Sequence, residues 1–314
     1  MSTRHLIAPD LLPLLEMMPA ATFNAETLPL IRQMSEGRFD ILGEPAMRPE
    51  VKVIEGPAGP LEVLWYDPAP GGRDRPALLH IHGGGMIIGS AKSMQHGPAA
   101  MAKALGLPIA SVEYRLAPEH PFPAPQEDCL AGLSWLAAHA DELGVDPLRI
   151  GIIGESAGGG LAAAVALMAR DQSGPQLAAQ FLVFPMLDHR TGGPQCRYNN
   201  PCTGEFVWTK DSNRFGWASL QGSYAPDDHR KGWFSPALAE SLDGLPPTWI
   251  GTGALDLFVD ENLDYARRLT AAGVPVELHV YTGAPHAFQL VAESRAAQMF
   301  YRDLFGAVSA WLAQ

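Results

Sequence analysis

Residues 149–160 read RIGIIGESAGGG. The apolar run before Gly154 predicts a buried strand, and the small residues after Ser156 predict a helix. A serine at the apex of a sharp strand-to-helix turn is the pattern of a nucleophile elbow, and glycines two positions away on each side avoid collisions there. The new helix would point its free N–H groups toward charge developing on Ser156. The same letters also fit a plain glycine turn with a solvated serine.

A second motif favours the catalytic interpretation. Residues 76–85 read PALLHIHGGG, an apolar strand that ends in three glycines. Glycines let backbone N–H groups approach a substrate carbonyl, as stabilisation of an oxyanion requires. The predicted donors are Gly83, Gly84 and Ala157. We expect His82 to brace this loop by hydrogen bonding. His80 and His82 would face one side of a strand and would also suit a metal, but no further ligand motif accompanies them, so we predict no metal site.

An acid and a histidine follow in the order serine, acid, histidine. Asp256 comes directly after one predicted strand, and His286 follows the next strand in a Gly/Pro loop. Asp260 competes with Asp256, but an acid in the opening turn of a helix is explained by the helix dipole. His279 alternates within a strand, and we expect it to face solvent or a neighbouring subunit. The predicted catalytic triad is Ser156, Asp256 and His286.

Four stretches together resemble the hormone-sensitive-lipase-like carboxylesterases, the bacterial family IV esterases. They are HGGG at 82–85, YRLAPEHPFPA at 114–124, GESAGG at 154–159 and PHAF at 285–288. The resemblance runs from about residue 50 to the C-terminus. It implies the α/β-hydrolase fold and the triad and oxyanion donors named above. In the mechanism expected of such a triad, no metal or organic cofactor has a role.

The chain departs from the family pattern at three places. Glu155 stands where the family often has Asp, and Met86 where it usually has an aromatic residue. Residues 256–260 read DLFVD, whereas the family commonly has Asp-Pro-Leu-x-Asp. We expect Met86 to alter the wall of the substrate pocket rather than the chemistry.

Composition limits the partners and the compartment. The 314 residues are 47% hydrophobic, enough for one large core, and the net charge of −12 disfavours nucleic acid and anionic membranes. A small neutral ester is therefore the expected partner. Three cysteines do not make a disulfide framework, so we predict free thiols at Cys129, Cys196 and Cys202. No signal-peptide pattern or membrane-spanning run is found, which favours a cytoplasmic protein.

Alternating strand and helix signals predict an α/β fold with a mostly parallel central sheet flanked by helices. The strand signals lie at 51–53, 61–66, 77–82, 109–114, 149–153, 180–184, 247–252 and 276–281, and the first two look like an antiparallel hairpin at one edge. Helices are expected at 126–139 and 293–312, among others. The catalytic domain is assigned to residues 46–187 and 236–314.

Two stretches do not follow this alternation. Residues 1–45 read as helices broken by prolines, and residues 188–235 form a long aromatic-rich insertion. Long excursions inside a compact domain are usually functional, and the resemblance implies that the two stretches form a helical cap. The residues expected to line the substrate entrance are Phe206, Trp208, Phe215 and Trp217. Alternatively, most of them join the two cap segments.

The predicted activity is hydrolysis of short- to medium-chain carboxylic esters through an acyl-enzyme. An amidase, a deacetylase or a long-chain lipase would use the same fold. A non-catalytic small-molecule receptor is the alternative from another class. The strand at 276–281 could also pair across an edge to make a homodimer.

Overall fold

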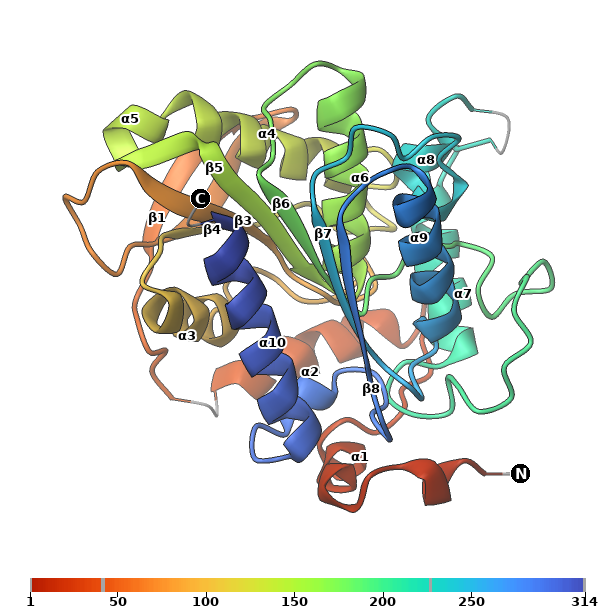
Figure 1. Ribbon diagram of the computed structural model, residues 1–314. Helices are drawn as coiled ribbons and strands as arrows, with labels where there is room; N and C mark the ends of the chain where they lie inside the picture. The colour runs from red at the N-terminus through yellow and green to blue at the C-terminus, as the bar shows by residue number, and fades with distance from the viewer. Residues whose placement is uncertain (1, 41–42, 226–227, 313–314) are drawn as a thin grey trace.

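Eight strands form one sheet in the order β1-β2-β4-β3-β5-β6-β7-β8 in the computed structural model (Figure 1). β2 runs antiparallel to both of its neighbours, β1 and β4, and all other pairs are parallel. The mostly parallel sheet and the edge hairpin are therefore confirmed. The strands are β1 Glu50–Gly56, β2 Gly59–Tyr66, β3 Arg75–Ile81, β4 Ile109–Val112, β5 Val145–Glu155, β6 Ala179–Val183, β7 Thr248–Gly253 and β8 Val276–Tyr281.

The structure describes residues 2–40, 43–225 and 228–312, and the side chains of these residues except 36–40. The predicted segments 1–45, 188–235 and 236–314 each include a few residues outside this description. The α-helices are α1 Pro13–Met17, α2 Leu28–Asp40, α3 His96–Leu105, α4 Ala124–Ala138, α5 Ala140–Leu143, α6 Ala157–Asp171, α7 Lys210–Gln221, α8 Lys231–Phe234, α9 Val259–Ala271 and α10 Arg295–Leu312. Short 3₁₀ helices lie at Arg4–Leu6, Pro9–Leu11, Pro236–Leu238 and Phe288–Leu290.

Helices cover both faces of the sheet, as parallel strands require. α4, α6 and α9 lie on one face, and α3 and α10 lie on the other (Figure 1). The central strands are consequently apolar on both sides, and every residue of β4, β6 and β7 is buried. Within the part of the chain that the structure describes, no helix has the length and apolarity needed to cross a bilayer.

Most predicted strands lie where expected, and β5 is the main exception. The sequence predicts its start at Arg149, but the strand begins at Val145. Val145 pairs with Arg75, and the register then shifts before Ala77 pairs with Ile150. The extra residues therefore form an irregular beginning that includes Pro147, a residue that argues against a strand when the sequence is considered alone.

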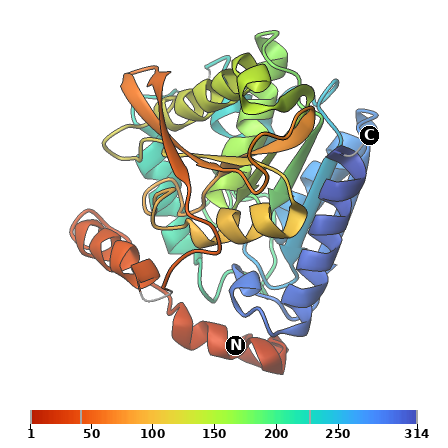
Figure 2. The ribbon, with the colours of Figure 1, turned by 90° about the vertical axis from the view of Figure 1, so that its left-hand side faces the viewer.

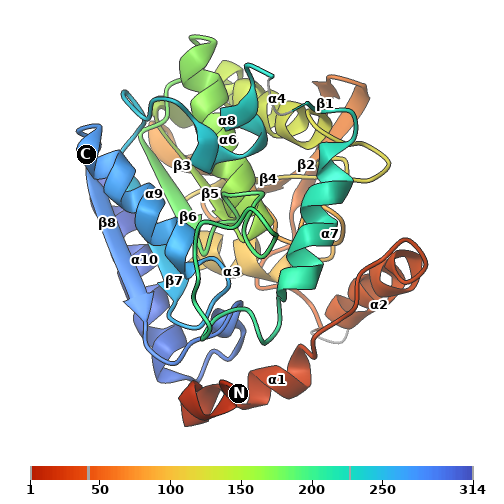
Figure 3. The ribbon, with the colours of Figure 1, turned by 90° about the vertical axis from the view of Figure 1, so that its right-hand side faces the viewer.

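The N-terminal helices α1 and α2 lie apart from the helical layers, near the carboxyl ends of the parallel strands (Figures 2 and 3). The turn before α2 is built by Asn24, whose Oδ1 accepts hydrogen bonds from the N–H groups of Glu26 and Thr27, both at 2.9 Å. α7, from the insertion between β6 and β7, lies at the same end of the molecule (Figure 3). The three described cysteines are free thiols, as predicted.

Candidate active site

Ser156 lies at the turn between β5 and α6, with φ 57° and ψ −119°. Its N–H donates to the carbonyl oxygen of Val183 at 2.8 Å, and the residue is 7% exposed. Gly158, two residues later, lets the end of β3 approach this turn: a β-carbon there would lie 2.0 Å from the carbonyl oxygen of Ile81. Residues 154–158 therefore form the strand-turn-helix geometry that the sequence predicts.

Three loops at the carboxyl ends of different strands bring a serine, a histidine and an acid together. The Ser156 Oγ–H donates to Nε2 of His286, with 2.9 Å between the heavy atoms. Nδ1–H of His286 donates to Oδ2 of Asp256 at 2.7 Å, and Oδ1 of Asp256 accepts from the N–H of Phe258 at 2.9 Å. Asp256 is 0% exposed and His286 is 5% exposed. Asp260 lies in the first turn of α9, so Asp256 is the acid bonded to the histidine.

The glycine loop after β3 lies beside the serine. A β-carbon at Gly83 would be 3.5 Å from Cβ of Ser156. Gly84 has φ +114°, a conformation that L side chains rarely adopt, and its carbonyl oxygen accepts from the N–H groups of Ile87 and Ile88. Among residues 2–40, 43–225 and 228–312, no hydrogen-bond acceptor is found for the N–H groups of Gly83, Gly84 and Ala157.

His82 braces this loop, as predicted. Its Nδ1–H donates to the carbonyl oxygen of Gly83 at 2.7 Å, and its ring stacks on Tyr114 with 4.2 Å between centroids. Burial lowers the pKa of His82 to about 3, so the imidazole is neutral at neutral pH. His80 instead bonds to the Ser111 hydroxyl at 2.8 Å and to Glu155 at 3.1 Å. Within the described residues, no group of three His, Cys, Asp or Glu side chains suits a metal ion.

Two of the predicted pocket residues lie close to the glycine loop. Met86 is 1% exposed and has φ 64°. Trp208 is 7% exposed, and its ring covers Gly85, where a β-carbon would lie 2.3 Å from the indole. The indole N–H donates to Oδ1 of Asn213 at 3.2 Å, and the ring centroid lies 5.5 Å from that of Phe23. Trp208 thus contacts both the glycine loop and the N-terminal segment.

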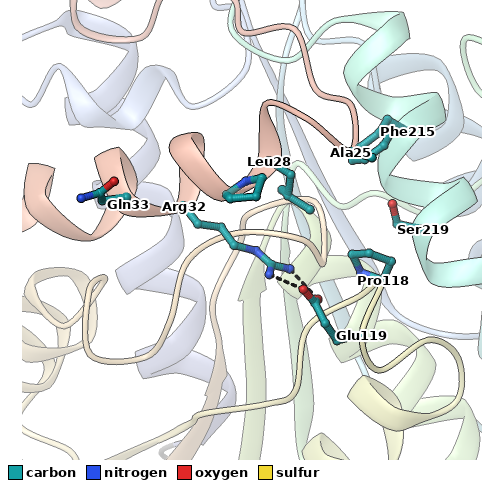
Figure 4. A pocket seen from close by; sticks show the side chains of 9 residues that line it. Ala25, Leu28, Arg32, Gln33, Pro118, Glu119, Phe215 and Ser219 are labelled. Carbon is teal, nitrogen blue, oxygen red and sulfur yellow. Dashed lines mark hydrogen bonds and ion pairs between the residues drawn. The ribbon is translucent and has the colours of Figure 1, made fainter.

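The other three aromatic residues lie in different surroundings. Phe215 lines a cavity of about 610 Å³ between α2 and α7 (Figure 4). Phe206 is partly buried against a cluster that includes Leu11 and Leu14 of the N-terminal segment. Trp217 is buried, and its ring centroid lies 5.4 Å from that of Phe234. Its contacts are therefore those of a residue that packs the interior.

Arg32 was not identified from the sequence, yet it contacts the glycine loop from α2. Its Nε donates to the carbonyl oxygen of Ile87 at 2.7 Å, and Nη2 donates to that of Ala117 at 2.9 Å. Both terminal nitrogens also bond to Glu119, at 2.7 and 2.8 Å (Figure 4). The acidic residue at position 119, between two prolines of the stretch at 114–124, was the available signal for such an ion pair.

Comparison with known proteins decides the family. A family model described as the α/β-hydrolase fold matches residues 78–290. The chain belongs to the α/β-hydrolase family. Within it, the chain is a hormone-sensitive-lipase-like carboxylesterase, as the four motifs indicated. The predicted fold and the predicted carboxylic ester hydrolysis are therefore confirmed.

Individual relatives of this carboxylesterase are also esterases. Esterase LipI of Mycobacterium tuberculosis is 34% identical over 286 residues, which cover 87% of this chain and 85% of the relative. Ethyl acetate hydrolase of Pseudomonas putida is 30% identical over 300 residues, which cover 89% and 91%. The solved structure of a bacterial heroin esterase superposes with a TM-score of 0.90 at 35% identity, covering 99% of both chains.

Proposed function

We propose that Ser156 is the nucleophile of this carboxylesterase, His286 its general base and acid, and Asp256 the residue that orients the histidine. The observation that carries this proposal is the buried chain of hydrogen bonds from Ser156 through His286 to Asp256. Because Asp256 accepts the Nδ1–H, Nε2 is left as the acceptor that faces the serine. That tautomer is the one that can remove the serine proton.

The reaction follows from these contacts. His286 takes the proton from Ser156 as Oγ attacks the ester carbonyl, and Asp256 stabilises the imidazolium. The N–H groups of Gly83, Gly84 and Ala157 receive the oxyanion of the tetrahedral intermediate, and one such donor is typically worth about 3–4 kcal/mol. His286 then protonates the leaving alkoxide. Water attacks the acyl-enzyme by the same sequence of proton transfers and releases the acid.

We propose a small neutral ester with a short- to medium-chain acyl group as the substrate. The net charge of −12 offers no attraction to an anionic substrate. The indole of Trp208 covers Gly85 and so limits the room beside the glycine loop. One relative is named for ethyl acetate, an ester with a two-carbon acyl group.

We also propose that residues 1–45 and 188–235 act together as a cap over the active site. Two contacts support this arrangement besides the Phe23–Trp208 ring pair. The Ser212 hydroxyl, in the insertion, donates to the carbonyl oxygen of Ala21 at 3.2 Å, and Ser2 donates to Glu205 at 2.6 Å.

The cytoplasmic location of the protein stays a prediction.

Initial rates on p-nitrophenyl esters from acetate to palmitate test the proposed function. We expect a maximum at short or medium chains and a rate at least 10³-fold lower in Ser156→Ala. Ser173→Ala is the matched control, because Ser173 is an exposed serine that also has a positive φ, 54°. A maximum at long chains would indicate a lipase, and faster cleavage of the matching p-nitroanilides would indicate an amidase. Activity that survives in Ser156→Ala would exclude this nucleophile.

A further inference from the structure

The three proposed oxyanion donors have one geometric property in common. In a planar trans peptide, the N–H points away from the carbonyl oxygen of the preceding residue. Whatever holds that carbonyl oxygen therefore fixes the direction of the N–H on the opposite side. The carbonyl groups that matter here belong to the residues before the donors, namely His82, Gly83 and Ser156.

Each of these three carbonyl oxygens accepts a hydrogen bond, but the donors are of different kinds. The Ser156 oxygen accepts from the N–H groups of Gly160 and Met186, both at 3.0 Å, so backbone alone fixes the Ala157 donor. The Gly83 oxygen accepts from His82, as described above. The His82 oxygen accepts from the Tyr114 hydroxyl at 2.9 Å. A tyrosine side chain thus holds the peptide group that presents the N–H of Gly83.

The surroundings of Tyr114 suit this task. It follows β4 and is 2% exposed, and its ring is within 15° of parallel to the His82 imidazole. A carbonyl oxygen cannot donate, so the hydroxyl must be the donor in this hydrogen bond. Burial raises the pKa of the Tyr114 hydroxyl well above its ordinary value, so the proton stays in place throughout the working pH range.

We propose that Tyr114 is a positioning residue whose hydroxyl orients the 82–83 peptide and so aims the N–H of Gly83 at the reacting carbonyl. This inference rests on the proposed function, because it assumes that Gly83 is an oxyanion donor. The effect belongs to the charged tetrahedral state, since an oxyanion needs the aimed donor more than a neutral ester does.

Removing a single oxygen atom tests the role. We expect Tyr114→Phe to lower kcat for p-nitrophenyl butyrate about tenfold and to change KM less than twofold. Inhibition by a trifluoromethyl ketone, which forms an oxyanion with the serine, should weaken by a similar factor. Tyr66→Phe is the matched control: Tyr66 is 0% exposed, and its hydroxyl has no hydrogen-bond partner among the described residues. This control should leave kcat and the inhibition constant unchanged.

Rescue distinguishes positioning from packing. 4-Aminophenylalanine at position 114 keeps a donor at the end of the ring, and we expect it to recover most of the lost kcat. Wild-type kcat and inhibition in Tyr114→Phe would overturn the proposal, and so would equal losses in Tyr114→Phe and Tyr66→Phe. A wild-type protein without ester turnover would instead refute the proposed function itself. If Tyr114→Phe folds poorly, the 4-aminophenylalanine variant decides. A kcat and an inhibition constant close to those of the wild type would support the proposal, and a tenfold loss in both would overturn it.

Discussion

Ser156 combines the proposed nucleophilic hydroxyl with a strained backbone. Its φ of 57° and ψ of −119° lie in a region that costs a non-glycine residue about 1–3 kcal/mol. The hydrogen bonds of its own N–H and carbonyl groups, to Val183, Gly160 and Met186, hold it there. This conformation places Oγ at the apex of the turn, 2.9 Å from Nε2 of His286.

Replacing Ser156 by glycine should therefore relieve the backbone strain and at the same time remove the hydroxyl needed for activity. We expect Ser156→Gly to raise the free energy of unfolding by about 1 kcal/mol relative to Ser156→Ala, because glycine accepts this conformation without strain. Both variants should lack ester turnover. Urea unfolding of the two variants at neutral pH measures the difference, and equal stabilities would mean that the turn stores no strain.

His82 should make the protein sensitive to mild acid. Its pKa is about 3 in the folded state, against an ordinary value of 6.5, so the unfolded state binds more protons between those limits. Stability should therefore fall as the pH drops below about 6.5, by up to about 1.4 kcal/mol for each pH unit.

Urea unfolding at pH 7.5, 6.0 and 5.0 measures this dependence. His82→Asn is the comparison, since Asn does not titrate and can donate from nearly the same place. We expect a flatter pH dependence in His82→Asn. Parallel curves for the two proteins would show that protonation of His82 is not what destabilises the fold.

Among single residues, the sequence points more directly to those proposed to carry the chemistry than to those that hold them in position. The serine, the histidine and the three glycines fall in short motifs with characteristic spacing, and the acid directly follows a predicted strand, so neighbouring letters are informative. The Tyr114–His82 bond spans 32 residues and the Arg32–Ile87 bond spans 55. Such contacts depend on how separate strands and helices meet, which spacing along one chain does not encode.

The attachment of α2 to the glycine loop links the N-terminal segment directly to the proposed active site. Arg32 lies on the wall of the cavity in Figure 4 and bonds to the carbonyl oxygens of Ile87 and Ala117 as well as to Glu119. Its guanidinium lowers the pKa of Glu119 to about 2, so the ion pair persists down to low pH.

Removing this attachment should affect catalysis more than stability. We expect Arg32→Ala to lower kcat/KM about tenfold, because small displacements of groups that contact the transition state are costly. Arg32→Lys should not restore the activity, since one ammonium group cannot make all of these bonds. Glu119→Gln is the control that weakens the ion pair but leaves the bonds to the loop. Equal losses in Arg32→Ala and Glu119→Gln would assign the effect to the ion pair instead.

The contact of Trp208 with Gly85 should influence acyl-chain preference. We expect Trp208→Leu to move the optimal p-nitrophenyl ester toward longer acyl chains, because the smaller side chain frees space beside the glycine loop. Trp217→Leu is the control, since that residue packs on Phe234. Both variants should lose about 2–4 kcal/mol of stability. An unchanged chain-length profile in Trp208→Leu would leave Trp208 as a purely structural contact between the insertion and the N-terminal segment.

Among the elements, alternating and continuous apolar runs predict most strands to within a few residues. The irregular start of β5 was missed because Pro147 and the exposed residues around it carry no strand pattern. Val145, at the start of this stretch, pairs with Arg75 of β3, and the pairing resumes only at Ile150. The position of α2 and of the segment before it was also beyond prediction from their own residues, since it depends on partners in the glycine loop and in α7.

The edge of the sheet formed by β8 is where a second copy of the chain could pair. β8 is the last strand, and no strand among the described residues pairs with its outer side. Val280 on this strand is 42% exposed, whereas His279 is partly covered, 28% exposed and bonded to Glu277 at 2.7 Å. An exposed edge strand is a natural site for pairing with a second chain.

The predicted homodimer can be measured directly. We expect light scattering to give twice the chain mass of 33.7 kDa, and Val280→Lys to give the mass of one chain, because lysine on an edge opposes strand pairing. Ester turnover should survive in the variant, as β8 contributes no proposed catalytic residue. A single-chain mass for the wild type at working concentrations would exclude the dimer.

The hydrogen bonds of residues 2–10 also determine when this segment can fold. The hydroxyl of Ser2 needs Glu205, the N–H of Ala8 donates to the carbonyl oxygen of Gly283 at 3.0 Å, and Asp10 accepts from the N–H of Arg295 at 2.8 Å. A ribosome adds about 5–20 residues per second, so the segment waits tens of seconds for its partners. Residues 2–10 can therefore take up these contacts only after residues 283 and 295 have been made, so this segment is among the last parts of the enzyme to pack.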